Sequence, residues 1–83
     1  MRAVYIRYAG PTATQGARWI VRDAYAAYSG RIVPIDSSLS RSNDMRRALE
    51  EWARWNRLRL VEVHFASTPQ GGVAVVRTEE ERP

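Results

Sequence analysis

The feature of this sequence that most constrains its fold is a single change of hydrophobic period. Apolar and polar residues alternate in 2–8 and again in 59–66, a period of two that predicts β-strands. One segment between them, about residues 43–57, instead follows the i, i+3, i+4, i+7 spacing of an amphipathic helix. The apolar stripe of that helix is Met45, Ala48, Leu49, Trp52 and Ala53.

The first half of the chain predicts three strands. The segment "RAVYIRY" is followed by a Gly–Pro pair that ends it, and "ARWIVRDA" is expected to return through the turn "YAAYSG" into "RIVPID" as a hairpin. Pro34 has no backbone N–H, so this third strand is expected at a sheet edge. A helix over residues 17–28 is the alternative, because its alanines favour a helix.

The second half predicts one more hairpin after the helix. "RLVEVHFA" alternates, the turn "STPQGG" follows, and "VAVVRT" returns. The alternation puts Val61, Val63 and Phe65 on one side of the strand, and Leu60, Glu62 and His64 on the other. The expected order is β-β-β-α-β-β, an α+β fold with a small five-stranded sheet and one amphipathic helix packed on one face. Residues 1–78 form this single domain, and residues 79–83 are expected to form a flexible acidic tail.

The outer face of the predicted helix is charged, and its spacing favours pairing of Arg46 with Glu50, Arg47 with Glu51 and Glu50 with Arg54. Both Trp52 and Trp55 are expected to point toward the sheet. One helix covers only one sheet face, and Tyr5, Tyr8 and Trp19 are difficult to bury at the same time. The remaining aromatic surface predicts a homo-oligomer or a stacked partner.

Composition excludes several kinds of chemistry. The chain has no cysteine and a single histidine, so it has no disulfide, no thiolate and no multi-histidine metal site. No apolar run approaches the roughly 20 residues that span a bilayer. Glu62 and His64 share a strand face, but no serine stands out as a nucleophile. We therefore expect a cytoplasmic, soluble protein that is not an enzyme and has no catalytic residue, no metal, no cofactor and no contact with a membrane.

Charge points toward an anionic partner. All thirteen basic residues are arginine, and residues 1–78 hold twelve of them against six carboxylates, within a formal net charge of +4 for the whole chain. The guanidinium fork binds phosphate in a bidentate way that an ammonium group does not. A GC-rich genome, which favours arginine codons, is the alternative explanation.

The loop "GPTATQGA" and its flanks form the candidate site. Gly10 and Gly16 permit positive φ, which would let backbone N–H groups converge on an anion. The threonine and glutamine side chains would add donors, and Trp19 would supply a plate for stacking on a planar ring. The alternative is a turn whose polar groups satisfy its own backbone. The predicted ligand-binding residues are Arg7, Thr12, Thr14, Gln15, Gly16, Arg18, Trp19 and Arg22.

The same segment resembles small uncharacterised proteins encoded by phages and prophages, which begin with a strand followed by G-P-T-x-T-x-G-x-R. Here Gly10, Pro11, Thr12, Thr14, Gly16 and Arg18 occupy those places. "IVPIDSSL" is similar to the V-P-Y-D-x-x-L of that group, and a helix opened by Asn43 and a final strand after glycines follow in the same order. The long connection "RDAYAAYSG" departs from the pattern. The resemblance implies a phage or mobile-element origin and carries no activity with it.

These observations lead to one functional hypothesis and two alternatives. The leading hypothesis is an oligomeric, non-enzymatic protein that captures a phosphate-bearing small molecule, a nucleotide, and so sequesters a nucleotide signal of a host anti-phage defence system. The first alternative is a nucleic-acid-binding module, since a basic sheet with aromatic residues is typical of proteins that bind single strands. The second is a direct inhibitor of a host defence complex, similar to anti-CRISPR proteins.

Overall fold

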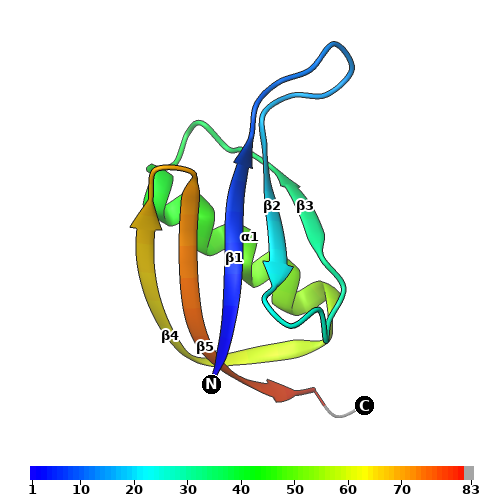
Figure 1. The fold of residues 1–83 in the computed structure, drawn as a ribbon, viewed down its shortest axis with the longest axis vertical. Helices are drawn as coiled ribbons and strands as arrows, with labels where there is room; N and C mark the ends of the chain where they lie inside the picture. The colour runs from blue at the N-terminus through cyan, green and yellow to red at the C-terminus, as the bar shows by residue number, and fades with distance from the viewer. Residues whose placement is uncertain (82–83) are drawn as a thin grey trace.

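The computed structural model describes residues 1–81, which form one antiparallel sheet and one helix (Figure 1). This confirms the predicted α+β fold and the order β-β-β-α-β-β. The elements are β1 (Arg2–Ala9), β2 (Arg18–Asp23), β3 (Arg31–Pro34), α1 (Arg41–Trp55), β4 (Leu58–Thr68) and β5 (Gly71–Glu80). Residues 17–28 are therefore strand and turn rather than helix.

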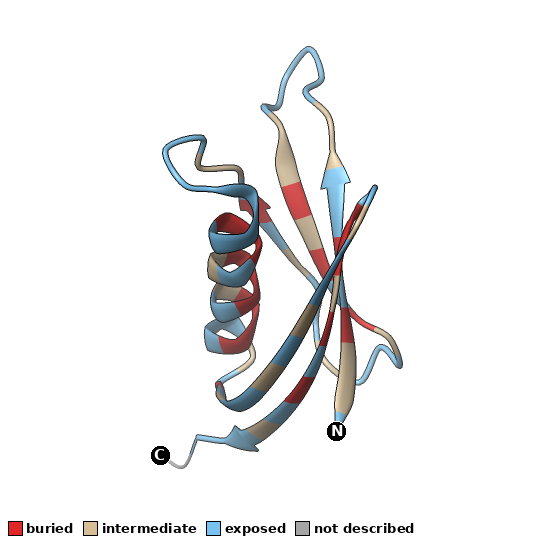
Figure 2. Cartoon of the chain, turned by 90° about the vertical axis from the view of Figure 1, so that its left-hand side faces the viewer, coloured by how far each residue is buried: buried red, intermediate tan, exposed pale blue. Residues whose placement is uncertain are grey.

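The strands are arranged in the order β3-β2-β1-β5-β4, and every neighbouring pair is antiparallel. The first strand thus lies at the centre, between the two hairpins. The short strand β3, which contains Pro34, is an edge strand, as the missing N–H predicted. The helix lies across one face of the sheet, and no other element of residues 1–81 covers the opposite face (Figure 2).

The core fills the space between the helix and the sheet face toward it. The stripe predicted from the helical period is buried, and Trp52 is fully enclosed. Alternate residues of the central strands pack against this helical stripe. Strand residues with a period of two and helix residues with a period of 3.6 thus form one hydrophobic core. The buried apolar residues of the strands are Val4, Ile6, Trp19, Val21, Val33, Leu58, Ala74 and Val76.

A buried carboxylate ties the helix to the sheet. Asp44, only 1% exposed, accepts hydrogen bonds from the Trp19 indole Nε1–H at 2.7 Å, the Asp36 backbone N–H at 3.0 Å and Arg47 Nε at 2.9 Å. It lies in the first helical turn, where the helix dipole also favours a negative charge. The N-cap is Ser40, so the expectation that Asn43 opens the helix is wrong by three positions.

The turn before the helix is organised by another carboxylate. Asp36 accepts hydrogen bonds from the Ser38 hydroxyl at 2.6 Å and from the Ser38 backbone N–H at 3.0 Å. These bonds, the hydroxyl bond first, lower the pKa of the Asp36 carboxyl from its ordinary 3.8. Asp36 is thus a turn residue, and Asp44 is a helix-start residue.

Two details of the strands differ from the expectation. A bulge between Leu60 and Glu62 shifts the alternation in β4, so Leu60 packs against the core with Val63 and Phe65 instead of facing away from them. The strand β5 continues through Glu79 and Glu80, where a flexible tail was expected to begin. The Glu81 backbone N–H donates to the Arg57 carbonyl at 3.0 Å, and the rest of the expected tail, residues 82–83, lies outside the described residues.

Two expectations for the helix surface are wrong. Trp55 is 58% exposed, and its ring lies under the Arg31 guanidinium at 4.4 Å instead of pointing toward the sheet. The ion pairs that form on the helix have i, i+3 spacing, Arg47 with Asp44 and Arg54 with Glu51, whereas i, i+4 pairs were expected. These short-range pairs place one positive charge at each end of the helix and leave Arg46 without a carboxylate partner among residues 1–81.

Candidate functional site

The face of the sheet away from the helix, here called the open face, presents a mixture of aromatic, aliphatic and arginine side chains. In an antiparallel sheet, residues directly opposite one another point to the same side. Tyr5 lies opposite Arg22 on β2 and Val73 on β5, and Arg7 lies opposite Ile20 and Gly71. The alternation that sends Val4 and Ile6 into the core therefore sends Tyr5 and Arg7 outward together. Tyr5 remains 42% exposed.

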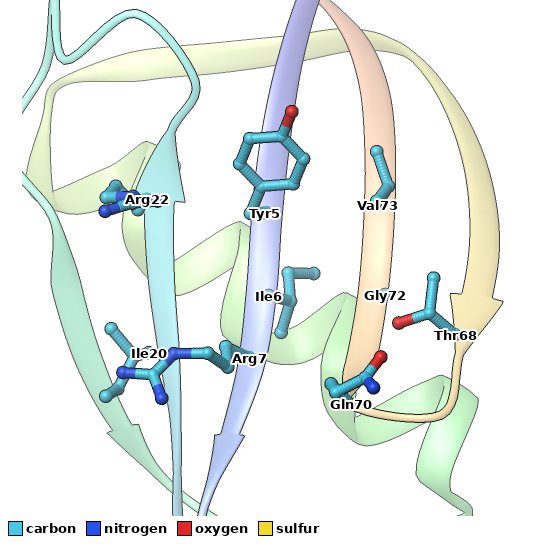
Figure 3. Close-up of a pocket in the computed structure, with 9 residues that line it drawn as sticks. All are labelled: Tyr5, Ile6, Arg7, Ile20, Arg22, Thr68, Gln70, Gly72 and Val73. Atoms are coloured by element: carbon cyan, nitrogen blue, oxygen red, sulfur yellow. The ribbon is translucent and has the colours of Figure 1, made fainter.

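A hollow of about 310 Å³ lies in the open face over β1, β2 and β5 (Figure 3). Its volume is at the lower end of the range for small-molecule sites. Ile20 and Val73 supply apolar surface on either side of β1, and the Tyr5 ring stands between them. The residues that line it are Tyr5, Ile6, Arg7, Ile20, Arg22, Thr68, Gln70, Gly72 and Val73.

Polar groups reach the hollow from two sides. Arg7 extends over β2 beside Ile20, and Arg22 lies further along the same strand (Figure 3). From the other side, Thr68 and Gln70 contribute a hydroxyl and an amide at the β4–β5 turn. The hollow thus combines two cations, a donor–acceptor amide and one aromatic ring.

The β4–β5 turn that carries Thr68 and Gln70 is fixed by contacts with both layers. The Tyr8 backbone N–H donates to the Gln70 carbonyl at 2.7 Å, and Arg41 Nη2 of the helix donates to the Thr68 carbonyl at 3.1 Å. Gly71 adopts a φ of +154°, and a Cβ there would lie 1.8 Å from the Ile6 carbonyl oxygen. Only glycine permits this close approach of β5 to β1, which brings the turn to the rim of the hollow.

The two arginines of the hollow have no carboxylate within ion-pair distance among residues 1–81. Arg2, in contrast, pairs with the buried Asp23 at 2.7 Å. Two uncompensated guanidinium groups beside a half-exposed ring create a positive potential over an apolar floor. A guanidinium group can bind an anion, and an exposed aromatic ring can stack on a planar group.

The loop that the sequence singled out is arranged differently from the expectation. Arg18 Nη1 donates to the carbonyl oxygens of Gly10 and Gly16, each at 3.3 Å. Carbonyl groups, rather than N–H groups, therefore converge, and they converge on a cation belonging to the chain itself. Neither glycine has a positive φ. The expected anion-binding backbone is not formed.

The other polar residues of the loop bind one another. The Thr12 N–H donates to the Gln15 carbonyl at 2.7 Å, and the Gln15 N–H donates to the Thr12 hydroxyl at 3.1 Å. Together with Thr14 and Gly16 they form an exposed turn that projects beyond the end of the sheet (Figure 1). None of these residues lines the hollow. Their hydrogen bonds agree with the alternative given above, a turn whose polar groups satisfy its own backbone.

Trp19 is not a stacking plate. It is 3% exposed, its indole N–H is engaged by Asp44, and the Tyr8 ring packs against it edge-on at 5.9 Å between centroids. The cause is its register: Trp19 lies opposite Tyr8 and shares the helix side of β2 with Val21. Of the predicted site residues, Arg7 and Arg22 alone line the hollow.

Seven residues of the hollow were not predicted as site residues: Tyr5, Ile6, Ile20, Thr68, Gln70, Gly72 and Val73. Period two in residues 2–8 already placed Tyr5 and Arg7 on one face, and that signal is sufficient to pair them. The two turn residues give no such signal, because their approach to β1 depends on the β1–β5 pairing over a separation of more than sixty residues.

No group of three or more histidine, cysteine, aspartate or glutamate side chains arranged to hold a metal occurs among residues 1–81. No helix of the described chain has the length and hydropathy needed to cross a bilayer. No protein-family model matches the chain, and neither a curated protein nor a solved structure matches it. The geometry of the open face is therefore the basis on which a function is inferred.

Proposed function

We propose that this protein is a non-enzymatic binding protein that captures a phosphate-bearing planar molecule, a nucleotide, on the open face of its sheet. The observation that carries the proposal is the placement of two uncompensated arginines, Arg7 and Arg22, beside the half-exposed ring of Tyr5 in one hollow. The proposed site thus keeps the two arginines predicted from the sequence and replaces the loop and Trp19 with the sheet face.

Each group has a role that follows from its chemistry. The guanidinium forks of Arg7 and Arg22 would bind phosphate oxygens in a bidentate way. The Tyr5 ring would stack on a base, an interaction worth about 1–3 kcal/mol. Gln70, whose backbone is fixed by Tyr8, would offer its amide to the polar edge of that base. Ile20 and Val73 would exclude water beneath the ring.

The biological setting of the proposal comes from the resemblance in residues 10–18. A small phage-type protein that captures a nucleotide would act by lowering the free concentration of a host defence signal. Homo-oligomer formation remains a prediction within this proposal. The exposed side chains of Tyr25 and Trp55 are the aromatic surface that supports it.

The proposal is tested by thermal unfolding in the presence of a nucleotide panel: UMP, AMP, ADP-ribose and a cyclic dinucleotide. A ligand present at 100 times its Kd adds about 2.7 kcal/mol to the free energy of unfolding. For a domain of this size each kcal/mol raises Tm by about 4–8 °C, so the expected rise is about 10–20 °C. Absence of a shift with every member of the panel would contradict the proposal.

Substitutions then locate the site. Arg22→Gln removes one charged hydrogen-bond donor group and is expected to weaken nucleotide binding about tenfold to hundredfold. The matched control is Arg46→Gln, because Arg46 is an exposed arginine on the helix, away from the open face. Equal losses of nucleotide affinity in these two variants would indicate nonspecific attraction to a basic protein. If Arg18→Gln weakened binding more than Arg22→Gln, the site would lie at the loop of residues 10–17 and not in the hollow.

A further inference from the structure

The open face continues beyond the hollow in both directions. On β3, Ile32 lies opposite Ile20 and is exposed. On β5, Val75 follows Val73 on the same face, and its partner on β4 is His64. Exposed apolar side chains therefore continue from the edge strand β3 to β5, and a ligand confined to the hollow would leave Ile32 and Val75 uncovered.

Positive charge also continues past the hollow. Arg77 lies on the open face of β5, four residues beyond Val73, which is about 13 Å at about 3.3 Å per residue. Its Nε is 3.7 Å from Glu62 Oε2, and both side chains are about half exposed, so this ion pair is weak. Arg77 is thus only weakly compensated, and Arg7 and Arg22 have no carboxylate partner among residues 1–81.

This charge distribution argues against a second copy of the chain as the occupant of the open face. Two open faces placed against each other would bring the uncompensated Arg7 and Arg22 close to the same residues of the second copy, and like charges at an interface are unfavourable. An occupant that is anionic along its length and carries planar rings fits both the basic and the apolar parts of the surface.

We infer that the occupant is a single-stranded nucleic acid, laid across the strands so that one nucleotide fills the hollow and its neighbours lie over the flanks. The inference rests on the proposed function and specifies its ligand. A duplex does not fit this description, because its bases are stacked inside and only phosphates would meet the Tyr5 ring and Val75. In a single strand the bases are free to stack while the phosphates contact the arginines.

The inference is tested by fluorescence anisotropy with labelled hexauridylate and hexathymidylate, and by competition with unlabelled UMP. We expect a hexamer to bind at least tenfold more tightly than UMP. Because each phosphate contact contributes about −0.7 to the slope of log K against log salt for a single strand, three arginine contacts predict a slope of about −2. A preference for either sugar is consistent with the inference and identifies RNA or DNA as the source.

The decisive variant is Arg77→Gln, because Arg77 lies outside the hollow. We expect it to weaken hexamer binding and reduce the slope to about −1.4, while UMP binding stays unchanged. The control Arg46→Gln is expected to change neither, and the Tm of each variant verifies folding. Three outcomes would show that the inference is wrong while the proposed function stands. The hexamer binds no more tightly than UMP, or a hexamer duplex binds as tightly as the single strand. The third is that Arg77→Gln weakens the binding of UMP and of the hexamer equally. If neither UMP nor a hexamer binds, the inference is wrong, and the proposed function is wrong as well when no other member of the nucleotide panel binds.

Discussion

Replacement of the buried carboxylate Asp44 is the sharpest test of the internal organisation described above. In Asp44→Ala the Trp19 indole N–H and the Asp36 backbone N–H lose their acceptor at once. The contact of Arg47 is lost too, but its side chain is about one third exposed, so water replaces much of that interaction.

The expected magnitude follows from those lost contacts. Each unsatisfied buried donor costs about 1–3 kcal/mol, so the loss in the free energy of unfolding is about 2–6 kcal/mol. Asp44→Asn keeps one carbonyl acceptor and is expected to lose less than the alanine variant. At about 4–8 °C per kcal/mol, a central loss of about 4 kcal/mol lowers Tm by roughly 15–30 °C.

The assay is urea unfolding followed by tryptophan fluorescence, with Tm measured in parallel by circular dichroism. The double-mutant cycle of Trp19→Phe with Asp44→Ala isolates the indole–carboxylate bond, because each substitution removes one partner of that bond. A coupling energy near zero, or an Asp44→Ala variant as stable as the parent, would refute the assignment of Trp19 to the core. Trp19 would then again be a candidate for stacking on a ligand ring.

Two further predictions concern local backbone and pH. Gly71→Ala is expected to destabilise the fold by about 3 kcal/mol or more in urea unfolding, because its Cβ would collide with the Ile6 carbonyl at a positive φ. Gly16→Ala, with open space around the added methyl, is the control and is expected to be neutral; equal effects would contradict the account of the β4–β5 turn. The lowered pKa of Asp36 means that its bonds from Ser38 stabilise the fold above pH 3.8, and this contribution is lost as the pH falls through the folded-state pKa. The stability difference between Ser38→Ala and the parent should therefore shrink below pH 3.8, and a difference independent of pH would show that the Asp36–Ser38 bonds are not its source.

The fold could be predicted from the sequence because its signals are local. Period two in the strands, one segment of helical period and a proline without an N–H were sufficient for the element order and for the edge position of β3. Pairing across the sheet is set by long-range contacts, so the central place of β1 between β2 and β5 was not specified. The bulge at residues 60–62 carries no strong local signal, and it moved Leu60 to the core side of β4.

The candidate site was only partly predictable from the sequence. A polar side chain that could bind a ligand can instead bind another group of the protein, and the sequence does not show which of the two occurs. Arg7 and Arg22 were identified as basic flanks of a loop, and the structure places both in the hollow. Arg18 flanks the same loop, but its guanidinium donates hydrogen bonds to two carbonyl oxygens of that loop. Trp19 finds Asp44, twenty-five residues away, and no pattern near either residue indicates that bond.

The central claim, that the open face is the binding surface, is tested most directly by titrating the ¹⁵N-labelled protein with each nucleotide of the panel and following backbone amide shifts by NMR. The account predicts that a binding nucleotide shifts Tyr5, Arg7, Arg22, Gln70 and Val73 most and leaves the Trp19 indole N–H unmoved. Changes concentrated in residues 10–17, or no change at any amide with any nucleotide of the panel, would contradict it.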